Sequence, residues 1–283
     1  MQTTPPTSSP PPSSPPSGAP LTIGHVVLVV EENHDYSQVI GDSLAPFLNS
    51  LATQYGLATQ YYADTHPSIG NYFMLTTGQI ETNDDSFSGT VSDDNIVRRL
   101  TAAGKSWKSY AQSLPGTGYT GGDSYPYLKR HNPFSYFSDV VSDPSQAANL
   151  VPFSQLSADL ASGNLPDFSY IVPDALNDAH DGSLTQADAW LKQNLAPLLS
   201  SPRFQGDGLL VITFDEADNS DSAHGGGHVV TIVVSPKAKK QFQSPTFFQH
   251  ESTLRLILSS LGISSFPGAS ASAPDMGVFL ASH

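Results

Sequence analysis

Cysteine is absent from this 283-residue sequence, and charged side chains are scarce. The lack of thiols excludes disulfide scaffolds, zinc–thiolate sites, iron–sulfur clusters and cysteine nucleophiles, while leaving the redox compartment open. Any metal site must therefore use oxygen and imidazole ligands. Charged residues make up 13% of the chain, compared with about 25% in a typical soluble domain.

The sequence also has few basic residues and no long apolar runs. The chain has 12 Lys+Arg against 26 Asp+Glu, for a formal net charge of −14. Binding to nucleic acid or to an anionic membrane surface requires clustered basic residues, so we expect no nucleic-acid partner. The strongest apolar runs, such as Val26 to Val30, Leu209 to Ile212 and Ile232 to Val234, are short. A spanning helix needs about 18 apolar residues, so we also expect no transmembrane segment.

The first twenty residues differ in composition from the rest of the chain. They contain eight Pro, five Ser and three Thr, residue types that do not build a packed core. We predict a disordered linker over residues 1–20 and a single domain over residues 21–283. Such linkers commonly tether exported domains, although the sequence shows no charged segment followed by the apolar segment of a signal peptide.

Four β-branched apolar runs without helical periodicity predict buried strands of a largely parallel sheet, at residues 25–30, 167–172, 208–214 and 229–234. Helical patterns lie between and after them, at residues 45–55, 93–103, 185–199 and 252–261. Ser92 is the expected N-cap of the second of these helices, and Gly104 follows its end. Alternating strands and helices indicate an α/β sandwich.

Two acidic clusters directly follow predicted strands, Glu31-Glu32-Asn33 after residue 30 and Asp215-Glu216 after residue 214. Ligands bind at the carboxyl edge of an open parallel sheet, so the clusters could converge there on one divalent cation. Ordinary polar loop starts are the alternative. The ligand types suit calcium, magnesium, manganese, iron or zinc and do not choose among them.

Ser68 lies where the loop Thr65-His-Pro-Ser-Ile-Gly-Asn71 enters a predicted short helix. A helix N-terminus offers free N–H groups to an anion. A serine hydroxyl there, in contact with a divalent cation, could lose its proton and attack phosphorus. Alternatively, Ser68 could only cap the helix.

Three further segments carry polar side chains with chemical potential. Residues 173–182 offer Asp178 and His180, which could hold a second metal or donate protons. Gly225-Gly-Gly-His228 permits close approach of the backbone to a ligand, unless it is simply a flexible surface loop. Lys129-Arg130-His131 is a compact basic group, and it could receive the anionic end of a substrate or be merely solvated.

Six motifs in order resemble those of the phosphoesterase family of bacterial and fungal acid phosphatases and phospholipases C. The resemblance covers residues 25–260, and its motifs are Glu32-Asn33-His34, His66-Pro67-Ser68-x-x-Asn71-Tyr72, Arg130-His131-Asn132-Pro133-Phe134, Asn177-Asp178-x-His180-Asp181-Gly182, Phe214-Asp215-Glu216 and Gly226-Gly227-His228-Val229. Two departures stand out. Gly70 occupies a position where family members often have Pro, and Glu216 lies where many have a second Asp, which preserves the ligand type.

The resemblance implies an alkaline-phosphatase-like three-layer α/β/α sandwich with a mostly parallel central sheet. It also implies Ser68 as the nucleophile and Glu32, Asn33, Ser68, Asp215 and Glu216 as metal ligands. His131, His180 and His228 would line the pocket and bind phosphate, a second cation or the proton of the leaving group. The remaining expected substrate contacts are Asn71, Lys129, Arg130 and Asp178.

The function implied is a metal-dependent acid phosphatase that hydrolyses small phosphomonoesters through a phosphoserine intermediate. The His66-Pro67-Ser68-x-x-Asn71-Tyr72 form of the nucleophile motif and the compact length resemble the small acid phosphatases more than the larger lipases. A phospholipase C or a phosphoinositide phosphatase is the alternative. A noncatalytic surface protein that binds a cation or phosphate is the alternative from another class. The linker and the resemblance together predict a secreted or cell-envelope protein, periplasmic or tethered to the surface, from a bacterial source.

Overall fold

The structure is a computed structural model that describes residues 23–281. The linker predicted for residues 1–20 lies outside the described residues, as do residues 21–22 and 282–283 of the predicted domain. Within residues 23–281, no helix combines the length and apolar character needed to cross a bilayer.

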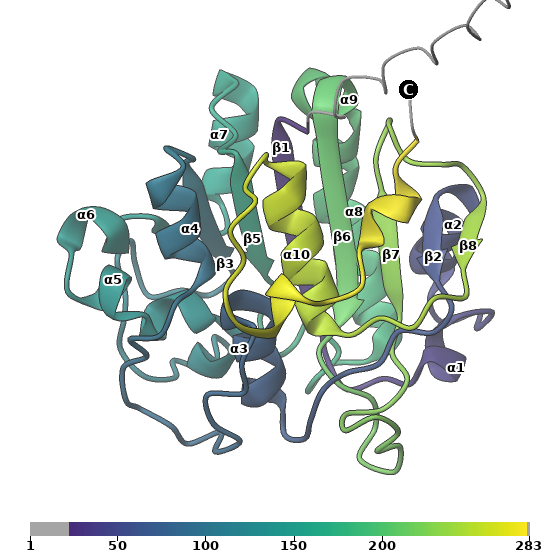
Figure 1. Ribbon diagram of the computed structural model, residues 1–283, viewed down its shortest axis with the longest axis horizontal. Helices are drawn as coiled ribbons and strands as arrows, with labels where there is room; N and C mark the ends of the chain where they lie inside the picture. The colour runs from purple at the N-terminus through teal and green to yellow at the C-terminus, as the bar shows by residue number, and fades with distance from the viewer. Residues whose placement is uncertain (1–22, 282–283) are drawn as a thin grey trace, which may run out of the picture.

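One eight-stranded sheet organises the described chain (Figure 1), in the order β4-β3-β5-β1-β6-β7-β2-β8. Every neighbouring pair is parallel except those formed by β7, which runs antiparallel to both β6 and β2. The sheet is therefore mostly parallel, as predicted. The strands are β1 (His25–Glu31), β2 (Gly56–Ala58), β3 (Trp107–Ala111), β4 (Leu150–Pro152), β5 (Phe168–Val172), β6 (Gly208–Phe214), β7 (Thr231–Val234) and β8 (Phe242–Ser244).

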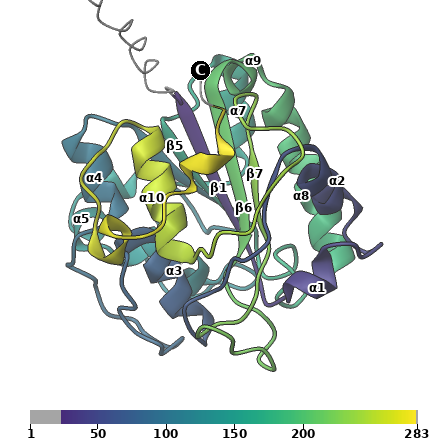
Figure 2. The same ribbon diagram turned by 45° about the vertical axis from the view of Figure 1, so that its right-hand side comes forward.

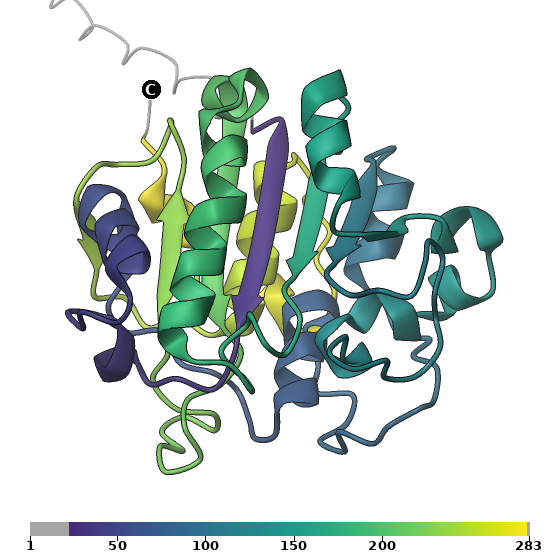
Figure 3. The ribbon, with the colours of Figure 1, turned by 180° about the vertical axis from the view of Figure 1, so that it is seen from behind.

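Helices cover both faces of the sheet and complete the three layers predicted from the sequence (Figures 1 and 2). Helices α3 (Ser68–Thr77), α4 (Ile96–Ala102) and α10 (His250–Ser260) lie on the face that is nearer in Figure 1. Helices α2 (Pro46–Gln54), α7 (Gln155–Ser162) and α8 (Leu184–Ser200) lie on the opposite face, which Figure 3 shows from the front.

Short helices fill the connections between these layers. They are α1 (Tyr36–Val39), α5 (Ser138–Val141), α6 (Pro144–Ala147), α9 (Pro202–Asp207) and the 3₁₀ helices η1 (Lys129–His131), η2 (Pro133–Tyr136), η3 (Gly268–Ala271) and η4 (Met276–Phe279).

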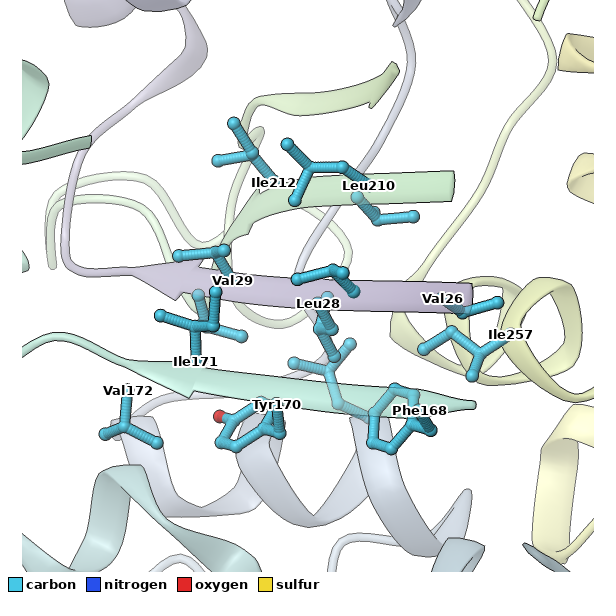
Figure 4. Close-up of a cluster of buried hydrophobic side chains, with 14 of the residues drawn as sticks. Val26, Leu28, Val29, Phe168, Tyr170, Ile171, Val172, Leu210, Ile212 and Ile257 are labelled. Atoms are coloured by element: carbon cyan, nitrogen blue, oxygen red, sulfur yellow. The ribbon is translucent and has the colours of Figure 1, made fainter. Parts of the chain in front are cut away.

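The core lies on both sides of the central strands (Figure 4). Val26 and Leu28 of β1, Phe168 of β5 and Leu210 of β6 are fully buried, and Ile257 of α10 packs near them. Strands buried on both faces must be apolar along their whole length, which explains why these runs lack the alternation of a half-exposed strand. Burial of this kind is the main stabilising contribution to the fold.

Three local expectations differ from the structure. Helix α4 begins at Ile96 with Asn95 as its N-cap, not with Ser92. The Asn95 side chain accepts from Arg98 N–H and donates to Asp139, a contact from a distant part of the chain. Strand β7 begins at Thr231 instead of Val229 and runs antiparallel to β6. Helix α10 begins at His250, earlier than the predicted start at residue 252.

The carboxyl ends of β1, β5 and β6 meet at one edge of the sheet, because the three strands are parallel and adjacent. Their arrowheads point to the lower edge in Figures 1 and 3, where α3 also lies. The predicted polar segments leave the sheet at this edge.

Candidate active site

Ser68 is the first residue of α3, and its side chain is buried between two acidic residues from different strands. Its hydroxyl donates to Glu32 Oε2 at 3.2 Å, and Oγ lies 3.3 Å from Glu216 Oε1. Glu32 follows β1 and Glu216 follows β6. Pro67 occupies the N-cap position of α3, and the Ser68 hydroxyl contacts the carboxylates instead of capping the helix.

The carboxylates around Ser68 are buried beside one another without an adjacent lysine or arginine in the contacts of the described chain. Burial raises the pKa of Glu32 and of Asp215 well above their usual range, and the neighbouring carboxylates raise both further. Burial also raises the pKa of Glu216 to about 8. A bound divalent cation would offset this repulsion.

The donor set fits such a cation. Asn33 Oδ1 and Asp215 Oδ2 are buried and have no hydrogen-bond partner. Asn33 has a left-handed backbone conformation, with φ 51°, and its N–H lies 3.3 Å from Asp215 Oδ1. Carboxylate, amide and hydroxyl oxygens are the ligand types that hard and borderline divalent cations prefer. The structure thus brings Glu32, Ser68, Asp215 and Glu216 together, and Asn33 joins them through its backbone N–H contact with Asp215.

His131 lies on the other side of Glu32, at the end of η1. Its Nδ1 is 3.0 Å from Asp178 Oδ2, and its Nε2 is 3.2 Å from Glu32 Oε1. Burial lowers the pKa of His131. A neutral ring that donates from Nδ1 to Asp178 keeps the lone pair of Nε2 directed into the site.

His180 adds a second imidazole near His131, with ring centroids 5.6 Å apart. Its Nδ1 is 2.8 Å from Asp181 Oδ1, and its Nε2 is 3.4 Å from Arg130 Nη2. Glu32, His131 and His180 each offer one potential ligand atom within 4.8 Å of the others. These three side chains form a second candidate position for a cation.

Asp178 and Asn71, predicted as substrate contacts, are used largely to hold neighbouring groups. Asp178 accepts from the His180 backbone N–H at 2.8 Å and pairs with His131. Asn71 Oδ1 accepts from the backbone N–H groups of Asp64 and Thr65, and its amide donates to Thr65 O. Asn71 therefore fixes the loop that leads into Ser68.

Arg130 lies at the edge of the site and Lys129 faces a neighbouring cavity. The Arg130 Nε is buried without a hydrogen-bond partner, while its Nη1 is 3.5 Å from Asp123. Lys129 Nζ donates to Thr120 O at 3.0 Å and lies 4.4 Å from the centre of the Tyr136 ring. The side chains of Lys129 and Arg130 thus extend from η1 to different partners.

His228 is placed apart from the carboxylates around Ser68. Its ring stacks on Tyr36 at 4.4 Å and on Tyr62 at 4.8 Å. Its Nε2 lies 3.2 Å from Thr59 O, and its backbone N–H donates to Asp221. These contacts fix the Gly225–His228 loop, in which Gly225 and Gly226 lie against the backbone of Asp64 and Thr65.

Three site residues were not predicted as such. The Tyr72 hydroxyl donates to Glu32 Oε1, and its ring stacks on His131 with centroids 5.2 Å apart. His66 Nδ1 is 2.9 Å from Glu216 Oε2. Asp85 accepts from the Ile69 N–H at the start of α3 at 3.2 Å. Tyr72 and His66 lie within the nucleophile motif, which is a signal for them, but Asp85 has no motif.

A layer of buried side chains supports the site from the α10 side. His250 is fully buried, and its Nε2 lies 2.6 Å from the Asp215 carbonyl oxygen. Its Nδ1 is 3.1 Å from the Tyr61 hydroxyl, which contacts Thr253 Oγ1 at 2.7 Å. Burial lowers the pKa of His250 to about 4. The first residue of α10 therefore holds the end of β6 in position.

Solved structures with the same fold were found at low sequence identity. A protein in the alkaline phosphatase superfamily from Vibrio parahaemolyticus aligns with a TM-score of 0.62 and 13% identity, over 86% of this chain and 67% of that chain. A phosphonate monoester hydrolase from Silicibacter pomeroyi aligns with a TM-score of 0.61 and 12% identity, over 91% of this chain and 76% of that one. These likenesses establish the alkaline-phosphatase-like fold.

Sequence relatives are closer. A phosphatidylinositol-3-phosphatase of Mycobacterium tuberculosis is 37% identical over 202 residues, which are 70% of this chain and 65% of the relative. A probable acid phosphatase of Kluyveromyces lactis is 33% identical over 236 residues, 80% of this chain and 55% of the relative. The chain spans less than two thirds of the length of each. The profile of the Phosphoesterase family matches residues 42–264, and the chain belongs to that family.

Proposed function

We propose that the protein is a metal-dependent acid phosphatase that hydrolyses phosphomonoesters through a phosphoserine intermediate on Ser68. The observation that carries the proposal is the Ser68 hydroxyl, held at the N-terminus of α3 between the carboxylates of Glu32 and Glu216. Membership of the Phosphoesterase family and the relatives named as acid phosphatases support it.

The nucleophile and its base are already in contact. The Ser68 Oγ attacks phosphorus in line with the leaving oxygen, and its proton passes to one of the two carboxylates it touches. The O–P bond to Ser68 forms as the bond to the alcohol breaks. The N-terminus of α3, where the positive end of the helix dipole lies, would stabilise the negative charge that develops on the phosphoryl oxygens.

The metal ligands proposed are Glu32, Asn33, Ser68, Asp215 and Glu216, whose orphaned and repelling oxygens fit a divalent cation. When bound, that cation supplies Lewis-acid polarisation of the phosphoryl group and lowers the pKa of the attacking hydroxyl. The cation is calcium, magnesium, manganese, iron or zinc, and comparison of these five in the assay identifies it.

His131, His180 and Arg130 are the residues proposed to act on the leaving alcohol, the attacking water and the phosphoryl oxygens. Asp178 holds His131 by Nδ1, so that the lone pair of Nε2 can accept a proton from the attacking water. The proton that Ser68 gives to a carboxylate passes on to the leaving alkoxide, which departs as the alcohol. Arg130, with its buried Nε, and His180 lie beside it and bind the phosphoryl oxygens. After the alcohol leaves, water attacks the phosphoserine and releases phosphate and the Ser68 hydroxyl.

A phosphoinositide phosphatase is the second candidate, because the relative from Mycobacterium tuberculosis is named a phosphatidylinositol-3-phosphatase. The acidic charge of the chain makes an anionic membrane a poor platform for that activity. A small soluble phosphomonoester is therefore the favoured substrate class. Analysis of the products released from a phospholipid separates a phosphatase from a phospholipase C.

The cellular location proposed for the protein is outside the cytosol, either secreted or in the cell envelope. The proline- and serine-rich composition of residues 1–20 and the resemblance to exported phosphatases support this location. Fractionation of cells that produce the full-length natural protein tests it. Recovery of the protein only in the cytosol contradicts it.

Hydrolysis of p-nitrophenyl phosphate between pH 4 and pH 9 tests the activity. We expect turnover that is highest at acidic pH, that is lost on chelation, and that returns with a divalent cation. Ser68→Ala should lack turnover under every condition. A rate that rises steadily to pH 9 contradicts the acidic optimum, and saturable phosphate binding without turnover favours a noncatalytic binding protein.

A further inference from the structure

A cavity of about 420 Å³ lies beside the N-terminus of α3. Two short loops, residues 85–88 and 120–123, form its walls together with Lys129 and Tyr136. Apart from Asp85, which accepts from the Ile69 N–H, these loops supply none of the residues used in the chemistry proposed above.

Two lining residues connect the cavity to the reactive hydroxyl. The Asp85 carboxylate accepts from Ile69 N–H, one residue from Ser68, and its charge adds to the raised pKa of Glu216. Lys129 lies in η1 two residues before His131, which contacts Glu32. The cavity therefore adjoins the first turn of α3, which carries Ser68, and lies within reach of a substrate bound at that hydroxyl.

The lining is chemically mixed. Asp85 and Asp123 provide carboxylate acceptors, Lys129 provides an ammonium donor, and Phe87 and Tyr136 provide apolar surface, with ring centroids 5.8 Å apart. The Lys129 ammonium is held by Thr120 O and keeps further protons to donate. Alternating donors and acceptors beside aromatic carbon match a ring that carries several hydroxyl groups.

We propose that this cavity binds the alcohol portion of the phosphomonoester and that this portion is a polyhydroxylated ring, a sugar or a cyclitol. The inference rests on the proposed phosphatase function and names its substrate class.

Gly122 allows the cavity to be filled without disturbing the site. A Cβ at Gly122 meets no atom within 4 Å, and its backbone conformation is one that other residues adopt. Gly116 shares both properties, precedes the same loop and does not line the cavity. Gly122→Leu and Gly116→Leu are therefore a matched pair of test and control variants.

The test compares three substrates: a hexose monophosphate, an inositol monophosphate and p-nitrophenyl phosphate. We expect Gly122→Leu to raise KM for the hydroxylated substrates about tenfold or more, with kcat little changed, while Gly116→Leu behaves as the unmodified protein. Lys129→Met should raise KM more for the hydroxylated rings than for the aryl ester. Lys192→Met, an exposed change on α8, is its control.

The outcomes distinguish failure of this inference from failure of the proposed phosphatase function. A KM that rises in Gly122→Leu for only the hexose or only the inositol substrate identifies the ring, and a rise for both supports a site for hydroxylated rings in general. Equal KM values for Gly122→Leu and Gly116→Leu on both hydroxylated substrates overturn the inference, as does an equal effect of Lys129→Met on the aryl ester. Absence of p-nitrophenyl phosphate hydrolysis by the unmodified protein instead overturns the proposed phosphatase function.

Discussion

His250 gives a prediction about stability that depends on pH. This side chain is fully buried between Asp215 and Tyr61, and burial lowers its pKa to about 4. An unfolded chain binds a proton at this histidine below about pH 6.5, while the folded chain binds it only near pH 4. The stability that the neutral ring contributes is therefore present above about pH 6.5 and is lost as the pH falls towards 4.

The interval between the two pKa values sets the size of the effect. An interval of about 2.5 units corresponds to a loss of about 3 kcal/mol between neutral pH and pH 4. Buried carboxyl groups such as Glu32 and Asp215 have raised pKa values, so their contribution has the opposite sign and partly offsets the loss. A single stability curve therefore does not isolate His250.

Comparison with His250→Gln removes that difficulty, because the carboxyl groups are shared by both proteins. Urea unfolding, in the presence of chelator, gives the free energy of unfolding at several pH values from 7.5 to 4. We expect the advantage of the unmodified protein over His250→Gln to shrink by about 3 kcal/mol across this range. His224→Gln, on an exposed loop, controls for removal of a histidine. A constant difference between the unmodified protein and His250→Gln at all pH values would refute the reasoning.

Three further predictions concern the site. Ser68→Ala should lower kcat/KM about a thousandfold or more while retaining the fold by circular dichroism, because it removes the attacking oxygen. Cation affinity should rise with pH up to about 8, because the raised pKa of Glu216 lets protons compete with the cation for this carboxylate. The expected gain is about tenfold per pH unit for each proton that the cation displaces. Calorimetry that gives the same affinity at all pH values contradicts this prediction. Asp178→Asn should lower kcat about 10- to 100-fold, because His131 loses the acceptor that fixes its tautomer, and steady-state kinetics with saturating cation measure the loss.

The sequence was most informative about the acidic residues that directly follow the ends of strands. Glu32, Asp215 and Glu216 follow apolar runs directly, and parallel neighbouring strands bring their carboxyl ends to one edge. Periodicity and the location of the runs were therefore sufficient to predict that these side chains meet. The same reasoning assigned Glu31 to the cluster after the strand, but Glu31 lies within β1 and is paired in register with Phe214.

Residues whose position depends on long-range packing could not be predicted. Asp85 reaches the start of α3 from an exposed loop, and only the folded chain places it there. His228 appeared suited to the pocket by motif, yet its ring is stacked between Tyr36 and Tyr62. The N-cap of α4 was equally dependent on tertiary contact, since Asn95 is held by Asp139. Local propensity does not contain this information.

The most direct test of the account is detection of phosphate on Ser68 during turnover. The protein is mixed with a phosphomonoester and cation, quenched in acid within the first turnovers, digested and analysed by mass spectrometry. The account predicts one added phosphoryl group on the peptide that contains Ser68, with none when chelator replaces the cation. Turnover without phosphorylated Ser68, together with inversion at phosphorus, would show direct attack by water and contradict the account.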